Sequence, residues 1–288
     1  MNTLSGLQEW PHRMGVVPGG TVMMMADVTR MAWMLRRQGI PFTPALLLDH
    51  FLNALGPSGT LLVPTFNHDL VSGDAFDVRR SPTITGALGQ AALGHPAFRR
   101  TGNALHSFAV AGAGAEEILA AKETSSFGPR SPFAFMRSHE ATIVSIDLHV
   151  TYALTYIHHV EEVEAVPYRR WRELSIRYTD HEGRTNDRIF RLYAKQPGHM
   201  NSTARLEVLL SEAGALRTGQ LDGLSYTLVD VPALHAALER DIRLNKARSI
   251  HDFSWERWFR DRLRPILRGK ERTRSDRALD DHAARTPR

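Results

Sequence analysis

The segment Ile143-Val-Ser-Ile146 is followed along the chain by Thr155-Tyr-Ile-His158-His159-Val-Glu161. The first is apolar enough for a buried strand, and the second has the character of a helix. Thr155, His158 and Glu161 recur every three residues, which places their side chains on one helix face. A hydroxyl, an imidazole and a carboxylate on one surface are the groups of a general-base site, since imidazole titrates near neutrality. A solvated, charged helix face would show the same pattern.

Strands and helices alternate through the chain. Apolar runs predict buried strands at 22–25, 60–63, 107–110 and 143–146. Helices are predicted at 31–38, 44–55, 85–94, 116–122, 153–164, 204–212 and 231–243, with Thr43 capping the second. Residues 174–193 predict an antiparallel hairpin around a turn at 180–183. We therefore expect one α/β domain over residues 1–256, with a central, mostly parallel sheet, flanking helices and an antiparallel hairpin insertion.

The charge is unevenly distributed. The chain of 288 residues has a net charge of +5, but residues 257–288 hold eleven Lys/Arg and five Asp/Glu, so this tail carries +6 and the rest −1. Few apolar residues follow Arg268, which predicts a basic, mobile tail. No aromatic side chains interleave that stretch, so nucleic acid is not an expected partner. The tail is either a solvated end or a dock for an acidic protein.

Several classes of protein are disfavoured by composition. The absence of cysteine removes disulfides, thiolate nucleophiles and cysteine-ligated zinc. No apolar run approaches the roughly 18–20 residues of a membrane span, and the start does not resemble a signal peptide. We expect a cytoplasmic protein without a membrane partner. His158 and His159 would point about 100° apart on a helix, so no metal site is expected.

Other stretches combine polar groups with turns or helix starts. Thr83, Thr85 and Gly86 open a predicted helix, where free backbone N–H groups suit an anion. An ordinary helix cap would look the same. The turn Phe127-Gly-Pro-Arg-Ser-Pro132 would make either a rigid wall beside a ligand or a plain loop. His106-Ser107 is explained equally by a polar site or by a strand end.

Taken in order, these stretches resemble the antibiotic N-acetyltransferase family typified by the aminoglycoside 3-N-acetyltransferases. The resemblance runs from about Val17 to about Asp230. The matching motifs are G-T-L-x-x-P-T-F at 59–66, S-P-x-x-x-G-x-L at 81–88, F-G-x-x-S-P at 127–132, T-x-x-H-x-x-E at 155–161 and V-P-Y at 166–168. The ordered set implies that family's α/β fold, which is distinct from the GNAT fold.

The resemblance also implies acetyl transfer from acetyl-CoA to a primary amine, without a metal. His158 would be the general base, and Glu161 would orient its imidazole or hold the substrate ammonium, with Thr155 beside them. Residues bordering acetyl-CoA would be Thr83, Thr85, Gly86, Arg100, Ser107, Gly128 and Ser131. Residues near the amine would be Thr65, Asp69 and Tyr168.

The departures from the family pattern concern the pockets. Met25-Ala-Asp-Val28 stands where the family usually has V-H-x-S, Asn103-Ala104 replaces a His-Pro pair, and Asp147-Leu-His149 replaces a glycine-rich strand end. The His158/Glu161 pair is kept, so we expect the same chemistry on a different substrate. An aminoglycoside is a polycation, and a body with a charge of −1 is poorly suited to it. An amino sugar or a biosynthetic amine is the expected acceptor.

Two alternatives stay open from the sequence. The acyl donor could be an acyl carrier protein, which is acidic and could dock on the basic tail. The chain could also be a binding protein that has lost catalysis on the same scaffold. The sequence also leaves a homodimer open.

Overall fold

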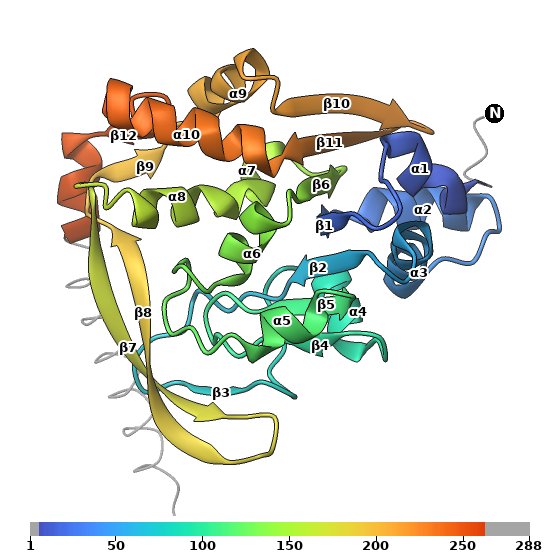
Figure 1. Ribbon diagram of the computed structural model, residues 1–288, viewed down its shortest axis with the longest axis horizontal. Coiled ribbons are helices and arrows are strands. Elements are labelled where there is room, and N and C mark those ends of the chain that lie inside the picture. The colour runs from blue at the N-terminus through green and yellow to red at the C-terminus, as the bar shows by residue number, and fades with distance from the viewer. Residues whose placement is uncertain (1–5, 263–288) are drawn as a thin grey trace, which may run out of the picture.

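A seven-stranded sheet crosses the part of the chain that the structure, a computed structural model, describes: residues 6–262 (Figure 1). Its strand order is β10-β11-β6-β1-β2-β5-β4. Strands β6, β1 and β2 pair in parallel, whereas β5 and β11 run antiparallel to their neighbours. Five of the seven strands in this described sheet therefore share one direction, which confirms the mostly parallel sheet. The strands are β1 Thr21–Ala26, β2 Thr60–Pro64, β4 Arg99–Arg100, β5 Phe108–Gly112, β6 Thr142–Ile146, β10 Leu216–Leu221 and β11 Leu224–Asp230.

The sheet is covered on both faces. Successive residues of a strand point to opposite faces, and in β1 Met23 joins one apolar cluster while Val22 and Met24 join the other. On the Met24 side lie α1 Trp10–Met14, α2 Thr29–Arg37, α3 Pro44–Leu55 and α4 Ala87–Gly94. On the Met23 side lie α5 Ala115–Ala120, α6 Pro132–Ser138, α7 Val150–Ala153, α8 Ile157–Val163, α9 Thr203–Glu212 and α10 Val231–Asn245. The predicted flanking helices are thereby confirmed.

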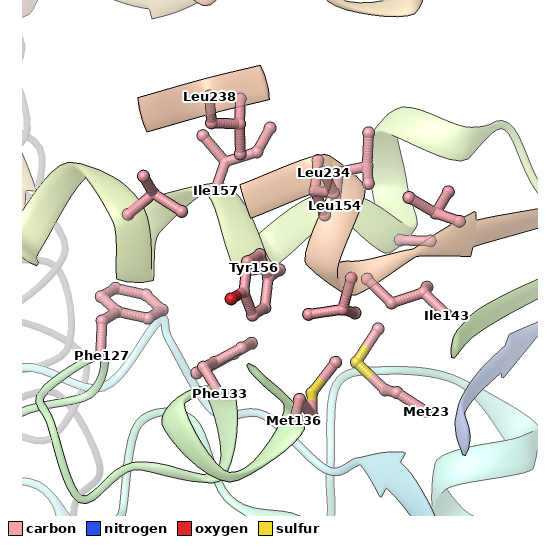
Figure 2. Packing of buried hydrophobic residues seen from close by; sticks show 14 of the residues in the cluster. Met23, Phe127, Phe133, Met136, Ile143, Leu154, Tyr156, Ile157, Leu234 and Leu238 are labelled. Carbon is pink, nitrogen blue, oxygen red and sulfur yellow. The ribbon is translucent and has the colours of Figure 1, made fainter. Parts of the chain in front are cut away.

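The segment after β6 is anchored by its apolar side chains. Leu154 and Tyr156, in the 3₁₀ turn η2 Leu154–Tyr156, and Ile157 pack toward α10 and α6 (Figure 2). The Tyr156 hydroxyl lies 2.9 Å from His235 Nδ1 of α10. Burying each large apolar side chain stabilises the fold by roughly 1.5–3 kcal/mol. This anchorage holds the polar face of α8 in a fixed direction.

A long hairpin extends from the sheet along the left of Figure 1. It consists of β7 Arg169–Thr179 and β8 Thr185–Lys195, paired antiparallel over their full length, and β3 Ala75–Asp77 adds to β7 in parallel. The predicted hairpin insertion is confirmed, and both strands are longer than the apolar alternation indicated. Shortly after the end of β8, the chain forms β9 His199–Asn201, which pairs with β12 His251–Phe253 in a separate two-stranded sheet.

The structure describes the first six residues of the predicted C-terminal tail, 257–262. Residues 255–262 are helical, and the Gly198 N–H donates to Asp261 Oδ2 at 3.0 Å. The Arg262 guanidinium lies over the Trp258 ring at 4.6 Å. The remainder of the predicted tail lies outside the described residues, so docking of an acyl carrier protein there stays a prediction, as does a homodimer. No helix within residues 6–262 is long and apolar enough to cross a membrane.

Candidate active site

A cleft of about 740 Å³ opens where the parallel strands end. Met25 and Ala26 at the end of β1, Phe66 beyond β2 and Leu148 beyond β6 all line it. In open α/β sheets, ligands bind outside the carboxyl ends of the strands. The start of α4 and the end of β8 form other parts of the wall, and Thr155 and His158 face the cleft from the segment after β6. Two members of the predicted catalytic set therefore meet at this edge.

His158 is held at one ring nitrogen and open to the cleft elsewhere. Its Nδ1 lies 2.6 Å from Glu161 Oε2, one turn further along α8. The side chain is 19% exposed, and this surface contributes to the cleft wall. A carboxylate at this distance favours the tautomer that carries its proton on Nδ1. Nε2 is then the unprotonated nitrogen available to a substrate.

Glu161 has no exposed surface, which decides between its two expected roles. The Tyr168 hydroxyl donates to Oε1 at 2.9 Å, and Arg169 Nε forms an ion pair with Oε2 at 2.7 Å. Both oxygens of the carboxylate therefore have partners inside the protein, and one of these partners is His158, which the carboxylate orients. The carboxylate cannot hold a substrate ammonium, and Tyr168, expected near the substrate, positions Glu161 instead.

Arg169 is a site residue that sequence reasoning missed. Besides Glu161, its guanidinium donates to the Tyr193 carbonyl oxygen at 2.7 Å through Nη1. Its Nη2 also lies 2.6 Å from His158 Nδ1; because Nδ1 carries its proton toward Glu161, this contact is a close approach of charge and not a hydrogen bond. The available signal was its position directly after the V-P-Y motif, at the first residue of β7. Its charge acts on both His158 and Glu161.

Burial and this arginine set the protonation of the pair. Loss of water contact and the charge of Arg169 lower the pKa of His158 to about 4, although Glu161 opposes both. Burial would raise the pKa of Glu161, but His158 and Arg169 together bring it below its usual value. Near pH 7 the pair is thus a neutral imidazole beside an ionised carboxylate. This is the state in which an imidazole can accept a proton.

The expected acetyl-CoA residues at the start of α4 divide into two groups. Thr85 Oγ1 donates to the Pro64 carbonyl at 2.6 Å and Thr83 Oγ1 to the Phe66 carbonyl at 3.1 Å. These bonds tie the loop to the end of β2. Thr85 and Gly86 line the cleft, whereas Thr83 does not. Gly86 caps α4 with a φ of 88°, a conformation that favours glycine.

Arg100 and Ser107 do not face the cleft, contrary to expectation. Arg100 is 4% exposed, and it donates to Ser107 Oγ at 2.9 Å and to the Thr65 carbonyl at 2.7 Å. Thr65 and Ser107 have no exposed surface, and their hydroxyls lie 3.1 Å apart. These three residues form a closed network with Asn67 Oδ1, which accepts from Arg100 at 2.7 Å. Thr65 therefore cannot be a substrate contact.

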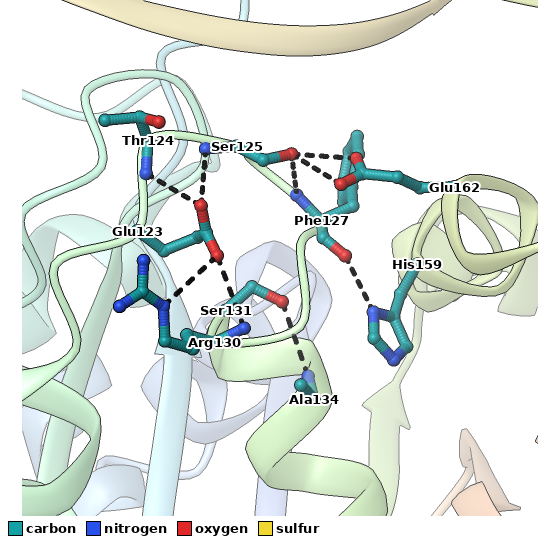
Figure 3. A network of polar contacts seen from close by, with 9 residues as sticks. All are labelled: Glu123, Thr124, Ser125, Phe127, Arg130, Ser131, Ala134, His159 and Glu162. Atoms are coloured by element: carbon teal, nitrogen blue, oxygen red, sulfur yellow. Dashed lines mark hydrogen bonds and ion pairs between the residues drawn. The ribbon is translucent and has the colours of Figure 1, made fainter. Parts of the chain in front are cut away.

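Gly128 and Ser131 are also part of the scaffold, and Figure 3 shows Ser131 among the polar contacts of this turn. A Cβ on Gly128 would come within 2.8 Å of the Glu123 carboxylate, so a larger residue there would displace that side chain. The Ser131 hydroxyl accepts the Ala134 N–H at 3.4 Å and so caps α6. Neither residue lines the cleft. The turn contributes Phe127 to the cleft wall instead, and His159 Nδ1 lies 2.7 Å from the Phe127 carbonyl oxygen.

The charge of the cleft departs from expectation as well. Asp69, the expected acidic contact, is exposed and does not line the cleft. Its neighbour His68 lines the cleft instead. Among the described lining residues Asp27 is the one carboxylate, while Arg169 and Lys195 bring positive charge. Asp27 also accepts the Thr29 N–H at 2.9 Å, and this bond lowers its pKa. Within the described part of the chain, no group of His, Asp or Glu is arranged to hold a metal.

The family model described as aminoglycoside 3-N-acetyltransferase matches residues 23–242, about three quarters of the chain. The chain belongs to this family. It is accordingly an N-acetyltransferase that depends on acetyl-CoA, and the alternative of a binding protein without catalysis is set aside. The open cleft beside His158 is consistent with that assignment.

Solved structures confirm the fold at low sequence identity. The aminoglycoside acetyltransferase AAC(3)-Xa is 23% identical with a TM-score of 0.68, over 82% of this chain and 90% of that one. AAC-IIIb, solved as a binary complex with CoASH, is 22% identical with a TM-score of 0.70, over 83% and 96%. The YokD protein from Bacillus subtilis is 15% identical with a TM-score of 0.65, over 81% and 96%. A search of curated proteins found no match.

Proposed function

We propose that this enzyme acetylates a primary amine on a small molecule of low positive charge, with His158 as general base. One observation carries the proposal: a neutral imidazole, fixed by a fully buried carboxylate, faces a cleft that has a single carboxylate on its wall. The first half of that observation supports the chemistry. The second half supports the class of acceptor.

The chemistry needs one proton to leave the amine as it attacks. The amine nitrogen adds to the thioester carbonyl carbon while His158 Nε2 takes the proton. The C–S bond then breaks, and the proton passes to the leaving thiolate of CoA. Glu161 stabilises the imidazolium formed in between, because its Oε2 already contacts Nδ1 at 2.6 Å. Holding both substrates in one cleft supplies much of the remaining rate enhancement.

The acceptor class is supported by the charges that line the cleft. A site for a polycation is expected to offer several carboxylates, since like charges on the wall repel it. Here Asp27 shares the described wall with two cations, Lys195 and Arg169, and the second of these is paired with Glu161. An acceptor with one ammonium group, placed beside Asp27, is compatible with these wall charges. An acceptor with four or five ammonium groups is not. An amino sugar or another biosynthetic amine fits best.

The donor side is supported by the start of α4. Gly86 and Ala87 line the cleft, and the helix has no side-chain cap. Its free N–H groups suit the phosphate or amide oxygens of acetyl-CoA. AAC-IIIb, which shares the fold, was solved with CoASH. Thr85 and Gly86 are thus the expected donor residues that the geometry retains.

The test is a panel of acceptors assayed by release of free CoA thiol from acetyl-CoA. We expect kcat/KM for glucosamine, a monoamine, to exceed that for sisomicin or gentamicin by at least about tenfold. Lys195→Glu should shift this ratio toward the aminoglycosides, and Asp69→Asn, outside the cleft, is the matched control. Efficient acetylation of gentamicin with a micromolar KM would overturn the proposed acceptor class. Transfer that survives His158→Ala would overturn the proposed base.

A further inference from the structure

His106 is a buried imidazole in the cleft wall with one unpaired nitrogen. The residue is 6% exposed and lines the cleft. Its Nδ1 is buried without a hydrogen-bond partner, whereas Nε2 is not among the buried unpaired atoms within residues 6–262. Buried polar atoms are nearly always paired, so an unpaired one at a site needs an explanation. A ring that carries its proton on Nε2 explains it, because Nδ1 is then an acceptor and not an N–H donor.

The ring is fixed in place by aromatic neighbours. Its centroid lies 5.0 Å from that of Phe66 and 4.7 Å from that of Phe127, and His68 stacks on it at 6.0 Å. Phe127 in turn contacts the His158 ring at 5.3 Å. His106 and His158 therefore contact the same phenylalanine. A group that reacts at His158 is within the neighbourhood of His106.

The protonation of His106 decides what it can offer. Burial, together with the nearby His158, lowers its pKa well below the usual value, so the ring is neutral. A neutral imidazole has one N–H and one acceptor nitrogen. A buried N–H without a partner is rarer in proteins than an under-satisfied acceptor. The favoured tautomer leaves the buried Nδ1 bare and places the proton on Nε2, the nitrogen left for the cleft.

We propose that His106 Nε2–H donates a hydrogen bond to the thioester carbonyl oxygen of acetyl-CoA. This role rests on the proposed function. As the amine attacks, the carbonyl π electrons move onto that oxygen, and the N–H stabilises the negative charge that develops. The oxygen becomes a carbonyl again when the C–S bond breaks, and His106 keeps its proton throughout. A neutral imidazole is suited to this task because it donates without transferring a proton.

Two other polar groups of the wall are committed elsewhere. His158 Nδ1 contacts Glu161, and its Nε2 is the base. The Lys195 ammonium donates to Asn201 Oδ1 at 3.1 Å. Among the described lining residues His106 is the buried imidazole, whereas His68 is exposed.

The direct test measures the carbonyl of bound acetyl-CoA and needs no acceptor. Acetyl-CoA labelled with ¹³C at the thioester carbonyl is bound to the full-length enzyme, and its C=O stretch is recorded by isotope-edited infrared difference spectroscopy. A hydrogen bond weakens the C=O bond and lowers the frequency. We expect a lowered frequency, relative to free acetyl-CoA, in the wild type and in His158→Ala, and its return toward the free value in His106→Phe.

Kinetics with the best acceptor of the panel give the second readout. Loss of one donor to a developing oxyanion costs about 10²–10³ in kcat, so His106→Phe should lose about that much with little change in KM for acetyl-CoA. His106→Gln keeps a donor and should recover about tenfold of the loss. If His106→Phe does not fold, His106→Gln takes its place in the infrared test. His106→Gln should then retain part of the lowering of the C=O frequency.

The outcomes separate this role from the proposed function. An unshifted carbonyl in the wild type, or a shift that persists in His106→Phe, would overturn the role of His106. A raised acceptor KM at unchanged kcat would do the same, because it would make His106 an acceptor contact. Absence of acetyl-CoA binding to the wild type would instead refute the function on which the role rests.

Discussion

Two buried polar networks, each built around an arginine, lie in this molecule, and only one of them reaches the cleft. Arg169 pairs with a carboxylate, Glu161, and that pair leaves one imidazole partly exposed. Arg100 contacts neutral oxygens of Thr65, Asn67 and Ser107, and burial lowers its pKa to about 10. The first network leaves a nitrogen for a substrate, and the second leaves nothing. The network whose groups are not all paired is thus the one that offers a nitrogen to the cleft.

This difference explains why residues of similar type have unlike roles. Arg100 and Ser107 match the family pattern as well as His158 and Glu161 do. Their donors are used to hold the end of β2 and the loop before β5 in place. That fixes the position of Phe66, which lines the cleft. The Arg100 network shapes the cleft, and the Arg169 network acts in it.

The largest effect is expected at the imidazole that the Arg169 network leaves open. His158→Ala removes the base while Glu161, Arg169 and Tyr168 remain. Loss of a general base typically costs 10²–10⁴ in rate, so we expect kcat to fall about 10³-fold, which corresponds to about 4 kcal/mol. Steady-state kinetics measure the loss, and calorimetry should show nearly unchanged affinity for acetyl-CoA.

The control for this variant is His139→Ala. His139 stacks on Phe135 on the far side of α6, outside the cleft lining, so its removal should leave kcat within about twofold. A similar loss in both variants would mean that histidine removal damages the fold in general. Comparison of the two isolates the proton transfer.

The part of the site that is local in sequence could be predicted, and the part that is assembled by the fold could not. Thr155, His158 and Glu161 share a helix face because of their spacing, and the pair His158/Glu161 forms as expected. Arg169, Lys195 and His106 come from the start of β7, the end of β8 and the loop before β5. Their convergence depends on how the hairpin meets the sheet. No spacing in the sequence encodes that contact.

The fold shows the same division. The bounds of helix α3 could be predicted, because Thr43 and Pro44 are residues that favour a helix start. In the structure Thr43 Oγ1 accepts the Leu46 N–H, and Pro44 stands in the first turn. The strands β10 and β11 were missed. They form the edge of the sheet and carry polar residues such as Arg217 and Gln220, so they lack the apolar run that marked β1 and β2. The pairing of β11 with β6 is a tertiary contact.

An intermediate effect, on stability and not on rate, is expected for the closed network. Arg100→Met keeps the length of the side chain but removes the donor to Asn67 Oδ1 and to the Ser81 carbonyl, while the Thr65 carbonyl keeps the Ser107 hydroxyl. Unpaired buried groups cost about 1–3 kcal/mol each, so we expect the free energy of unfolding to fall by about 3 kcal/mol in urea denaturation. The folded protein should keep kcat within about threefold.

Arg99→Met is the matched control for Arg100→Met. Arg99 is the neighbouring residue of β4, and its side chain, 57% exposed, pairs with Glu116 at the surface. Exposed ion pairs contribute about 0–1 kcal/mol, so this variant should be nearly as stable as the wild type. A large loss of kcat at unchanged stability in Arg100→Met would break the distinction between the two networks and return Arg100 to the active site.

The smallest effect tests whether Tyr168 acts on His158 through Glu161. Tyr168→Phe removes the hydroxyl that donates to Glu161 Oε1. The carboxylate then has one donor fewer, so it holds the imidazolium more strongly but orients it less firmly. We expect kcat to fall about three- to tenfold, and the acid limb of kcat/KM, set by the His158 pKa of about 4, to move toward higher pH. Tyr193→Phe loses a comparable buried bond, 2.8 Å to the Val166 carbonyl, and should reduce stability alone. A merely structural Tyr168 would leave the pH profile unmoved, so a shift in Tyr168→Phe that is absent from Tyr193→Phe assigns the hydroxyl to the catalytic network.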